Sequence, residues 1–283
     1  MLTIGPSFAT DPATTGVLSS SRVAALRQQS GRSIEQLMEE LVPFARVLAQ
    51  PMVSRYHVGV VARGSSGALY YGANLEFPGQ TLPFTVHAEQ SATTNAWNNG
   101  ETELTSVAVS AAPCGYCRQF LYETTGAARM DVMVAGRAKT TLTPGLLPEA
   151  FGPSDLGVKT ALMAPESVSL QLQQPSSHPL VLEALKAAER SYAPYTNSYA
   201  GAAVQDTTGR IFPGRLAENA AYNPSLSPLA SALAMAALAR VSQTAIAEVA
   251  LVEVANAAVS QLPVTQTLVD ALGVGSFTYA LAT

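Results

Sequence analysis

The 283-residue sequence has little charge and no basic cluster. Only 13% of its residues are charged, and 16 Lys and Arg against 20 Asp and Glu give a formal net charge of −4. Proteins that bind nucleic acid usually present a basic surface to the phosphates, so nucleic acid is not an expected partner. By contrast, 48% of the residues are hydrophobic, which predicts a packed core and not a disordered chain.

Long apolar runs are also missing. The longest weakly polar stretch, residues 229–239, is much shorter than the roughly 20 residues that a membrane-spanning helix needs. The first basic residue is Arg22, so the chain does not open with the charged segment of a secretory signal. We therefore expect a soluble cytoplasmic protein with reduced thiols and no membrane partner.

Cysteine is scarce, and the only two cysteines, Cys114 and Cys117, are close together in the sequence. Their C-x-x-C spacing is compatible with a redox pair, a metal site or one small disulfide. A redox pair also needs a thioredoxin-like context, which the surrounding sequence lacks. The neighbouring residues are needed to distinguish between these options.

The order of the predicted elements indicates an α/β fold. Ser33 and Gln36 form a capping-box signature ahead of a helical apolar pattern, in which Pro43 is expected to introduce a kink. Short β-rich runs then alternate with helical ones, and this β-β-α-β-α-β order predicts a mixed sheet covered by helices. The predicted strands are 57–62, 68–73, 106–111 and 131–135, and the predicted helices are 86–98 and 114–123.

The second half of the chain repeats the first at a nearly fixed offset of 142 positions. The segment Gly72-Ala-Asn-Leu-Glu76 recurs as Gly214-Arg-Leu-Ala-Glu218. Such self-similarity predicts a duplicated domain, and a chance match of turn glycines is the alternative. The same offset places Leu229, Ser231, Asn256 and Val259 opposite His87, Glu89, Cys114 and Cys117.

The repeat divides the chain into four parts. We expect a small N-terminal helical segment over residues 1–48 and a catalytic domain over residues 49–170. A Pro/Gln/Ser-rich linker over residues 171–180 then leads to a second domain over residues 181–283. At the matched positions the second copy has no residue able to bind a metal or move a proton. The chemistry is therefore expected in the first copy alone.

The first copy supplies one imidazole, two thiols and one carboxylate, in His87-Ala-Glu89 and in Pro113-Cys114-Gly-Tyr-Cys117. Zinc binds Cys and His in a tetrahedron, and three protein ligands with an open fourth position are typical of a catalytic site. With no third cysteine and only two other histidines, the chain cannot readily close a structural site. We predict a catalytic zinc site with the ligands His87, Cys114 and Cys117.

Helical spacing divides the roles of these residues. If Cys114 opens a helix, Cys117 lies one turn farther along the same face, so both sulfurs can reach one ion. His87 and Glu89 are two positions apart and do not share a helical face, so Glu89 is expected beside the open ligand position as a proton shuttle. Helix amides at Cys114 and the cationic Arg118 are expected to lower the pKa of the thiols.

The combined signature H-x-E…P-C-x-x-C is that of zinc deaminases, and further motifs narrow the resemblance. The segments Tyr56-His-Val-Gly, Gly-Ala-Asn74-Leu-Glu76 and, in the second copy, Ala-Glu-Asn-Ala-Ala-Tyr222 resemble cytidine deaminases of the long, two-copy type. The resemblance covers roughly residues 30–280. It implies a duplicated three-layer α/β/α fold with a mixed sheet, a zinc cofactor and a homodimer.

The resemblance also implies an activity. Cytidine deaminases hydrolyse cytidine and 2′-deoxycytidine to uridine and 2′-deoxyuridine with release of ammonia, a reaction of pyrimidine salvage. Carried over to this chain, water activated by zinc would attack C4 of cytosine. Glu89 would take the proton of that water, deliver it to ring N3 and later protonate the leaving amino group. The expected partners are a small neutral nucleoside and a second copy of the chain.

Five further residues acquire expected roles through the resemblance. Asn74 and Glu76 would hydrogen-bond the hydroxyls of the ribose. Tyr56 would stack on the pyrimidine, and Ala88 would lie against the substrate. Tyr222 would help to close the site of the partner subunit. The alternatives are a strand-end turn residue for Asn74, a surface carboxylate for Glu76 and a core aromatic for Tyr56.

Two other functions stay open. One is the deamination of another cytosine compound, such as a nucleoside antibiotic. The other is a non-catalytic zinc protein in which a former active site stabilises a dimer. The carboxylate of Glu89 argues against the second function, because a structural zinc site gives no reason for a carboxylate beside an open ligand position.

Overall fold

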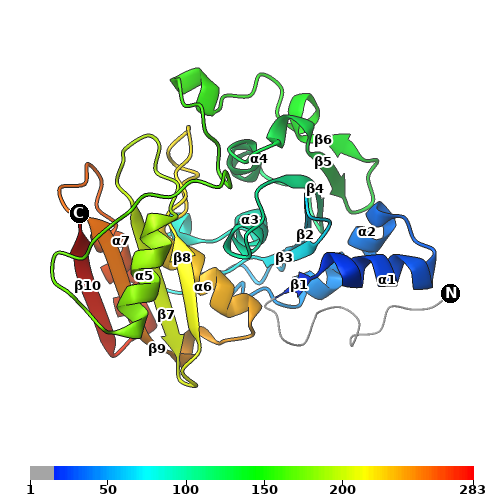
Figure 1. The fold of residues 1–283 in the computed structure, drawn as a ribbon. Helices are drawn as coiled ribbons and strands as arrows, with labels where there is room; N and C mark the ends of the chain where they lie inside the picture. The colour runs from blue at the N-terminus through cyan, green and yellow to red at the C-terminus, as the bar shows by residue number, and fades with distance from the viewer. Residues whose placement is uncertain (1–15) are drawn as a thin grey trace.

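Two β-sheets, each with helices on both faces, organise residues 16–283, the part of the chain that the computed structural model describes (Figure 1). This is the mixed α/β architecture that the sequence predicts. The helices are α1 (Ser20–Ser30), α2 (Ile34–Arg46), α3 (Ala88–Asn98), α4 (Gly115–Tyr122), α5 (Pro179–Glu189), α6 (Pro228–Leu238) and α7 (Leu262–Leu272). The strands are β1 (Val17–Leu18), β2 (Gly59–Gly64), β3 (Leu69–Ala73), β4 (Leu104–Val109), β5 (Asp131–Val134), β6 (Thr140–Thr141), β7 (Ala200–Asp206), β8 (Ile211–Arg215), β9 (Ile246–Val254) and β10 (Ser276–Ala282).

The two sheets share one core topology. The order β3-β2-β4-β5 in the first sheet corresponds to β8-β7-β9-β10 in the second, with two antiparallel pairs followed by one parallel pair in each. The register repeats as well, because Val61 pairs with Ala108 and, 142 positions later, Ala203 pairs with Ala250. A β-bulge near the end of β2 recurs near the end of β7. The predicted duplication is confirmed.

The predicted elements are present with small shifts of their ends. Strands β2 to β5 and helices α3 and α4 overlap the six predicted ranges, and their ends differ by at most two residues. The capping box of Ser33 and Gln36 is present at the start of α2. Pro43 lies inside α2, which continues as one element to Arg46. Among the helices of residues 16–283, none is long and apolar enough to cross a membrane.

Four glycines allow the helices to approach the sheets closely. Helix α2 covers one face of the first sheet at Gly59, and α5 covers one face of the second sheet at Gly201. On the opposite faces, Gly72 meets α3 and Gly214 meets α6, and at each an added Cβ would lie 2.2 Å from a helix carbonyl oxygen. Since α3 and α6 also contact each other, the layers run in the order α2, first sheet, α3 with α6, second sheet, α5.

Helix α2 therefore packs as part of the first unit. Residues 1–48 are predicted as a separate N-terminal segment, but α2 takes the place on the first sheet that α5 takes on the second. Residues 1–15 lie outside the described part of the chain. The predicted linker also has a structural role, because Gln171 and Thr283 exchange two backbone hydrogen bonds of 2.9 Å beside the end of β10.

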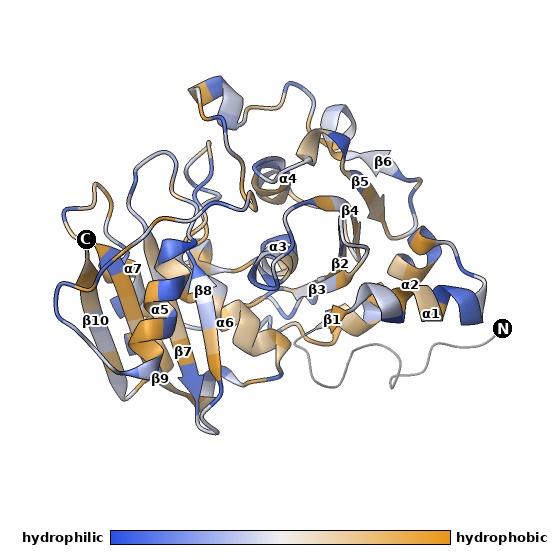
Figure 2. Cartoon of the chain, in the orientation of Figure 1, coloured by the Kyte–Doolittle hydropathy of each residue, from blue (hydrophilic) through white to orange (hydrophobic). Residues whose placement is uncertain are grey.

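Helices α3 and α6 occupy the centre of the molecule (Figure 1). Every residue of α6 is buried, and so is every residue of α3 up to Trp97. Helix α6 is built from Ala, Leu, Met, Pro and one Ser, whereas α3 carries Glu, Gln, Ser, Thr and Asn (Figure 2). The helix with the polar side chains is thus buried as completely as the apolar one, so its side chains depend on partners inside the protein.

The central helices repeat at an offset of 140 positions, because α3 begins at Ala88 and α6 begins at Pro228. The connection before α6 is therefore two residues shorter than the connection before α3. The fixed offset of 142 positions gives a wrong match for His87 and Glu89. The structural counterparts of His87 and Glu89 are Ser227 and Leu229, and the predicted counterparts Leu229 and Ser231 lie two positions too far along.

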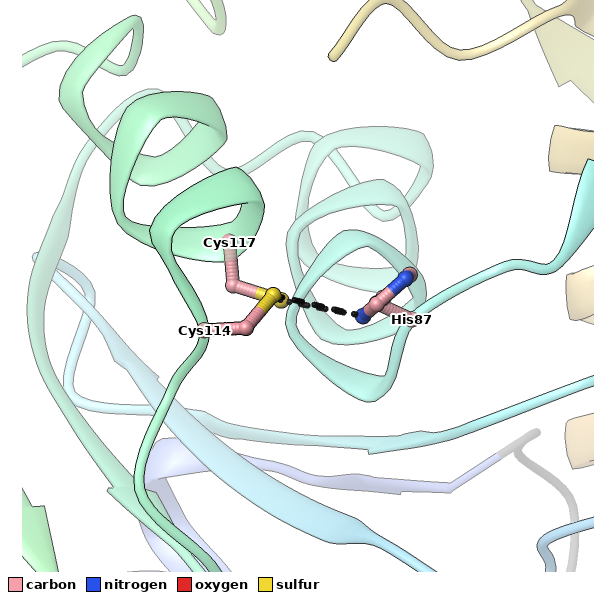
Figure 3. Close-up of side chains that lie close together, drawn as sticks. All are labelled: His87, Cys114 and Cys117. Carbon is pink, nitrogen blue, oxygen red and sulfur yellow. Dashed lines mark hydrogen bonds between the residues drawn. The ribbon is translucent and has the colours of Figure 1, made fainter. Parts of the chain in front are cut away.

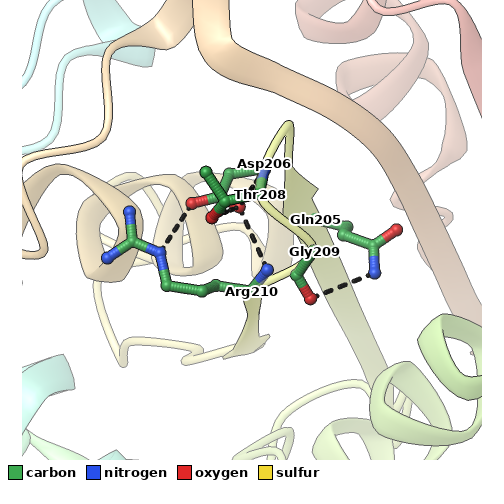
Figure 4. Close-up of polar contacts among 5 residues, drawn as sticks. All are labelled: Gln205, Asp206, Thr208, Gly209 and Arg210. Carbon is green, nitrogen blue, oxygen red and sulfur yellow. Dashed lines mark hydrogen bonds and ion pairs between the residues drawn. The ribbon is translucent and has the colours of Figure 1, made fainter.

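Different carboxylates hold the hairpin turns of the two copies. After β7, Asp206 accepts hydrogen bonds from its own turn and forms an ion pair with Arg210 Nε at 2.8 Å (Figure 4). The first copy has Gly64 at this position, and its turn is held by Glu101, which accepts hydrogen bonds from the two serines there. A Cβ at Gly64 would lie 1.9 Å from the Glu101 carboxylate, so glycine leaves room for that side chain.

We expect Gly72→Ala to destabilise the protein, because the added Cβ would push α3 away from β3. Overpacking of this kind lowers the free energy of unfolding by about 1–3 kcal/mol, which urea denaturation followed by circular dichroism would measure. Gly275→Ala is the matched control, since no heavy atom lies within 4 Å of an added Cβ there. A stability of Gly72→Ala equal to that of the wild type would contradict the close approach of α3.

Candidate active site

Helix α3 begins with the residues that carry the imidazole and the carboxylate. His87 is the N-cap, and its backbone N–H donates to Gln90 Oε1 at 3.1 Å in a capping box. Ala88 and Glu89 form the first helical turn and are both buried. The close packing of this turn against β3 at Gly72 fixes where the two side chains start.

Helix α4 begins with the two thiols, as the spacing predicts. Cys114 is the N-cap and Cys117 lies in the first turn, with Cys114 exposed and Cys117 buried. Arg118 does not act on the sulfurs in the expected way, since its guanidinium donates to Pro113 O at 2.9 Å and to Leu146 O at 2.7 Å. The Arg118 side chain therefore links the segment before Cys114 to the segment that contains Leu146.

His87, Cys114 and Cys117 converge on one point (Figure 3). His87 Nδ1 lies 3.3 Å from Cys117 Sγ and 3.8 Å from Cys114 Sγ, and the two sulfurs are 3.5 Å apart. In a tetrahedron with Zn–S bonds of about 2.3 Å and Zn–N bonds of about 2.0 Å, ligand atoms are roughly 3.5–3.8 Å apart. The three donor atoms thus fit a zinc ion close to their present separations and leave a fourth position for another ligand.

The start of α4 makes Cys114 the more acidic thiol. The hydrogen-bonding contact of 3.5 Å between the Cys114 and Cys117 sulfurs, aided by backbone N–H groups of Tyr116 and Cys117, lowers the pKa of Cys114 to about 5. The same hydrogen bond, burial and the neighbouring Glu89 raise the pKa of Cys117. The expected effect of the helix amides is confirmed for Cys114. Because the thiolate is the form that binds metals, this ligand is ready to do so at neutral pH.

Glu89 differs from the other buried glutamates of residues 16–283. Its carboxylate accepts one hydrogen bond from another residue, the Cys117 thiol, at 3.1 Å. Burial raises the pKa of Glu89. A buried carboxylate with acceptor capacity to spare, beside an open ligand position, can take up and release a proton. Each of the others accepts at least three hydrogen bonds from N–H or O–H groups: Glu76, Glu101, Glu123, Glu218 and Glu253.

The two predicted sugar-binding residues lie on a segment that pairs with the chain just before α3. Leu75 and Val86 exchange backbone hydrogen bonds of 2.9 Å, which places Asn74 and Glu76 next to the strand that leads to His87. Both side chains are largely buried. The structure thus brings the segment with Asn74 and Glu76 next to the start of the helix that carries Glu89.

Asn74 supports the loop that carries Tyr56. Asn74 Nδ2 donates to Tyr56 O, and Asn74 Oδ1 accepts from the Val58 N–H, both at 2.9 Å. Tyr56 itself is 59% exposed in the single chain, so the core-aromatic alternative is wrong and its ring is free to contact a ligand.

Glu76 supports the same loop through its carboxylate. The carboxylate accepts hydrogen bonds from the backbone of Val53 and from the backbone and hydroxyl of Ser54, and these bonds outweigh burial and lower the pKa of Glu76. Glu218 accepts the matching bonds from Tyr195 and Thr196 in the second copy. Glu76 is therefore not a surface carboxylate, and support of the loop is a role that it shares with its counterpart.

Tyr222 is the predicted site residue that no described contact joins to the others. Its side chain is 65% exposed, and its ring lies edge-on to that of Tyr195, with 6.2 Å between the centroids. The same loop does reach α3 of its own chain, because Gln90 Nε2 donates to Pro224 O at 3.1 Å.

Sequence reasoning missed two residues of the site, Gln90 and Tyr116. The Tyr116 ring stacks on the His87 imidazole, with 5.1 Å between the centroids and 28° between the planes. Gln90 holds the N-cap of α3 and contacts the second copy. Its position three residues after His87 is a capping-box signal, but histidine is not among the usual N-cap residues. No signal pointed to Tyr116, since its spacing does not tell which way the ring turns.

Comparison with known proteins agrees with this site. Two family models described as "Cytidine and deoxycytidylate deaminase zinc-binding region" match residues 32–134 and 144–266. A cytidine deaminase of Photorhabdus laumondii is 42% identical over 263 residues, which make up 93% of this chain and 88% of that relative. The chain belongs to the cytidine deaminase family. Only one cluster of metal-binding side chains lies in the described residues of this family member, and it is in the first copy.

Further relatives of this deaminase are similar over shorter spans. A cytidine deaminase of Yersinia pestis is 43% identical over 220 residues, which make up 78% of this chain and 74% of the relative. Among solved structures, the cytidine deaminase from Mycobacterium tuberculosis has 28% sequence identity and covers 43% of this chain and 99% of its own, with a TM-score of 0.39.

Proposed function

We propose that this member of the cytidine deaminase family hydrolyses cytidine and 2′-deoxycytidine to uridine and 2′-deoxyuridine, with release of ammonia. The observation that carries the proposal is the carboxylate of Glu89, which is buried within 3.1 Å of the zinc-binding Cys117 sulfur and accepts no other hydrogen bond from a neighbouring residue of the described chain. Such a group serves a reaction that moves protons and is of no use in a purely structural metal site.

The residues of the site divide the reaction between them. His87, Cys114 and Cys117 would hold a zinc ion, which would lower the pKa of a water molecule so that a nucleophile is available near neutral pH. Glu89 accepts a proton from this water and delivers it to N3 of the pyrimidine while C4 gains the oxygen. Glu89 then passes the second proton of the water to the amino group, which leaves as ammonia. One carboxylate can perform both steps because burial raises its pKa.

The loop residues support a nucleoside as the substrate. Tyr56 offers an exposed aromatic face for the pyrimidine, and Asn74 and Glu76 supply polar atoms for the ribose hydroxyls. Ala88, in the first turn of α3, would lie against the base. A carboxylate near the sugar would repel a 3′-phosphate, which favours a free nucleoside over a polynucleotide.

We also infer that the active form is a homodimer and that it works in the cytoplasm. Large apolar side chains are exposed in the segments before β2, before α3 and before α6, a feature typical of protein interfaces. They are Met52 at 63%, Val53 at 53%, Leu82 at 74% and Tyr222 at 65% exposure. Two free thiols suit a reducing compartment.

Turnover of cytidine by the zinc-loaded protein, followed as loss of the cytosine absorbance, tests the proposal directly. Glu89→Gln keeps the shape of the side chain but cannot exchange the proton, so we expect kcat to fall by about 10²–10⁴-fold. Zinc content, measured by atomic spectroscopy, should stay at the wild-type level. A zinc-loaded wild type without turnover, or a Glu89→Gln variant as active as the wild type, would refute this function.

Glu76→Gln and Glu218→Gln separate sugar binding from loop support. Each variant weakens the hydrogen bonds from two backbone N–H groups and one hydroxyl that hold a loop in its own copy. Only Glu76 is proposed to contact ribose. Loss of one hydrogen bond to a charged group costs about 1.5–3 kcal/mol, so KM for cytidine should rise roughly tenfold or more in Glu76→Gln. Similar KM values for the two variants would mean that Glu76 only supports its loop.

A mixing experiment tests the role of Tyr222 in a dimer. Tyr222→Ala should lower kcat/KM about tenfold by opening the partner's site. In a mixed dimer with Glu89→Gln chains, the Tyr222→Ala chain keeps its own Glu89 and receives Tyr222 from its partner. Activity should therefore exceed the mean of the two variants after subunit exchange. A monomer mass in light scattering, or strictly average activity, would rule out this arrangement.

A further inference from the structure

A buried carboxylate joins the end of α4 to the second copy. Glu123, the C-cap of α4, has no exposed surface. Its Oε1 accepts hydrogen bonds from Tyr192 Oη at 2.8 Å and from Tyr195 Oη at 2.5 Å, and its Oε2 accepts one from the Ala220 N–H at 2.9 Å. All three donors belong to loops of the second copy, one before β7 and one before α6.

The carboxylate is held by hydrogen bonds alone. Among the ion pairs of residues 16–283, none includes Glu123. Burial and the neighbouring carboxylate raise the pKa of Tyr192 and of Tyr195, so both hydroxyls keep the protons that they donate. One turn earlier, Gln119 and Asn219 add a second link, in which Asn219 Nδ2 donates to Gln119 O at 3.1 Å. The C-terminal half of α4 is thus attached to the second copy at two points, Gln119 and Glu123.

The length of α4 makes this attachment matter for the zinc site. The helix has eight residues, which is about 12 Å, and a helix so short is not stable without tertiary contacts. In its first half, Arg118 ties α4 to carbonyl groups of the first copy. Since Cys114 and Cys117 lie on the first turn, a tilt of the far end would shift both sulfurs relative to His87.

We propose that Glu123 is a positioning residue through which the non-catalytic copy orients α4. The orientation of α4 in turn sets the distances from the two sulfurs to His87 Nδ1. The same copy reaches the other metal-binding helix through the hydrogen bond between Gln90 and Pro224 O, and α3 and α4 are neighbours (Figure 1). The second copy thus contacts the helices that carry all three metal-binding side chains. This inference rests on the proposed zinc-dependent function.

Release of zinc to a chromogenic chelator tests the proposal without any substrate. In Glu123→Gln, the amide nitrogen faces groups that are themselves donors, so the link from this side chain to the second copy is weakened. Loss of residues that orient metal ligands costs about 10–100-fold in metal affinity or activity. We therefore expect zinc release at least about tenfold faster than in the wild type and a kcat about tenfold lower. KM should stay within about threefold, because Asn74 and Glu76 lie on another segment.

Glu253→Gln is the matched control. Glu253 is as deeply buried and accepts hydrogen bonds from a tyrosine hydroxyl, a serine hydroxyl and a backbone N–H, all within the second copy. It should lower the melting temperature as much as Glu123→Gln does and leave zinc release and kcat unchanged. Equal acceleration of zinc release in both variants, or release from folded Glu123→Gln within about twofold of the wild type, overturns the proposal.

The two tyrosine donors provide milder variants. Tyr192→Phe and Tyr195→Phe each remove one hydrogen bond to Glu123, and both should accelerate zinc release in proportion to their effect on kcat. If Glu123→Gln does not fold, unchanged zinc release in both tyrosine variants overturns the proposal. A wild type that binds zinc and does not turn over cytidine would refute the proposed function, whereas the comparison of zinc release would still stand.

Discussion

The burial of helix α3 from Ala88 to Trp97 is the constraint on which the site depends. Polar side chains inside a protein are costly unless they are hydrogen-bonded, and several side chains of α3 meet this condition through partners outside the helix. Asn95 donates to the carbonyls of Gly16 and Tyr71, and Ser91 accepts from a β3 amide. These bonds fix the helix against β3 and against the segment before β1. The side chains at its start, His87 and Glu89, therefore project from a rigid element and not from a mobile loop.

The second copy of the domain supplies further neighbours of α3. In α6 the position of Glu89 is taken by Leu229, which is fully buried. An apolar side chain there avoids the desolvation of a carboxylate, so α6 needs no hydrogen-bond partner at this position. The loops of the second copy meanwhile contact α3 at Gln90 and α4 at Glu123. The copy without chemistry thus contributes to the geometry of the copy that has it.

Local patterns in the sequence predicted much of this fold, and long-range contacts limited the rest. The capping box at Ser33 and the start of α4 at Cys114 follow from residues within one turn, and both are confirmed. The repeat was visible because strands keep their spacing, but a loop shorter by two residues displaced the match of the central helices. Leu146, the second partner of Arg118, and the partners of the Glu123 carboxylate are remote in sequence, so no local pattern could identify them.

The buried glutamates show how a structure separates a carboxylate that reacts from one that supports. Desolvation acts on Glu89 and on Glu123 alike and raises the pKa of both. Glu123 is surrounded by three O–H and N–H donors that hold it in one position, and protonation would disrupt those bonds. Glu89 has only a thiol, which is a weak donor. Gaining a proton therefore costs Glu89 little in lost hydrogen bonds, and this small number of hydrogen bonds, more than burial, supports its proposed role as the proton carrier.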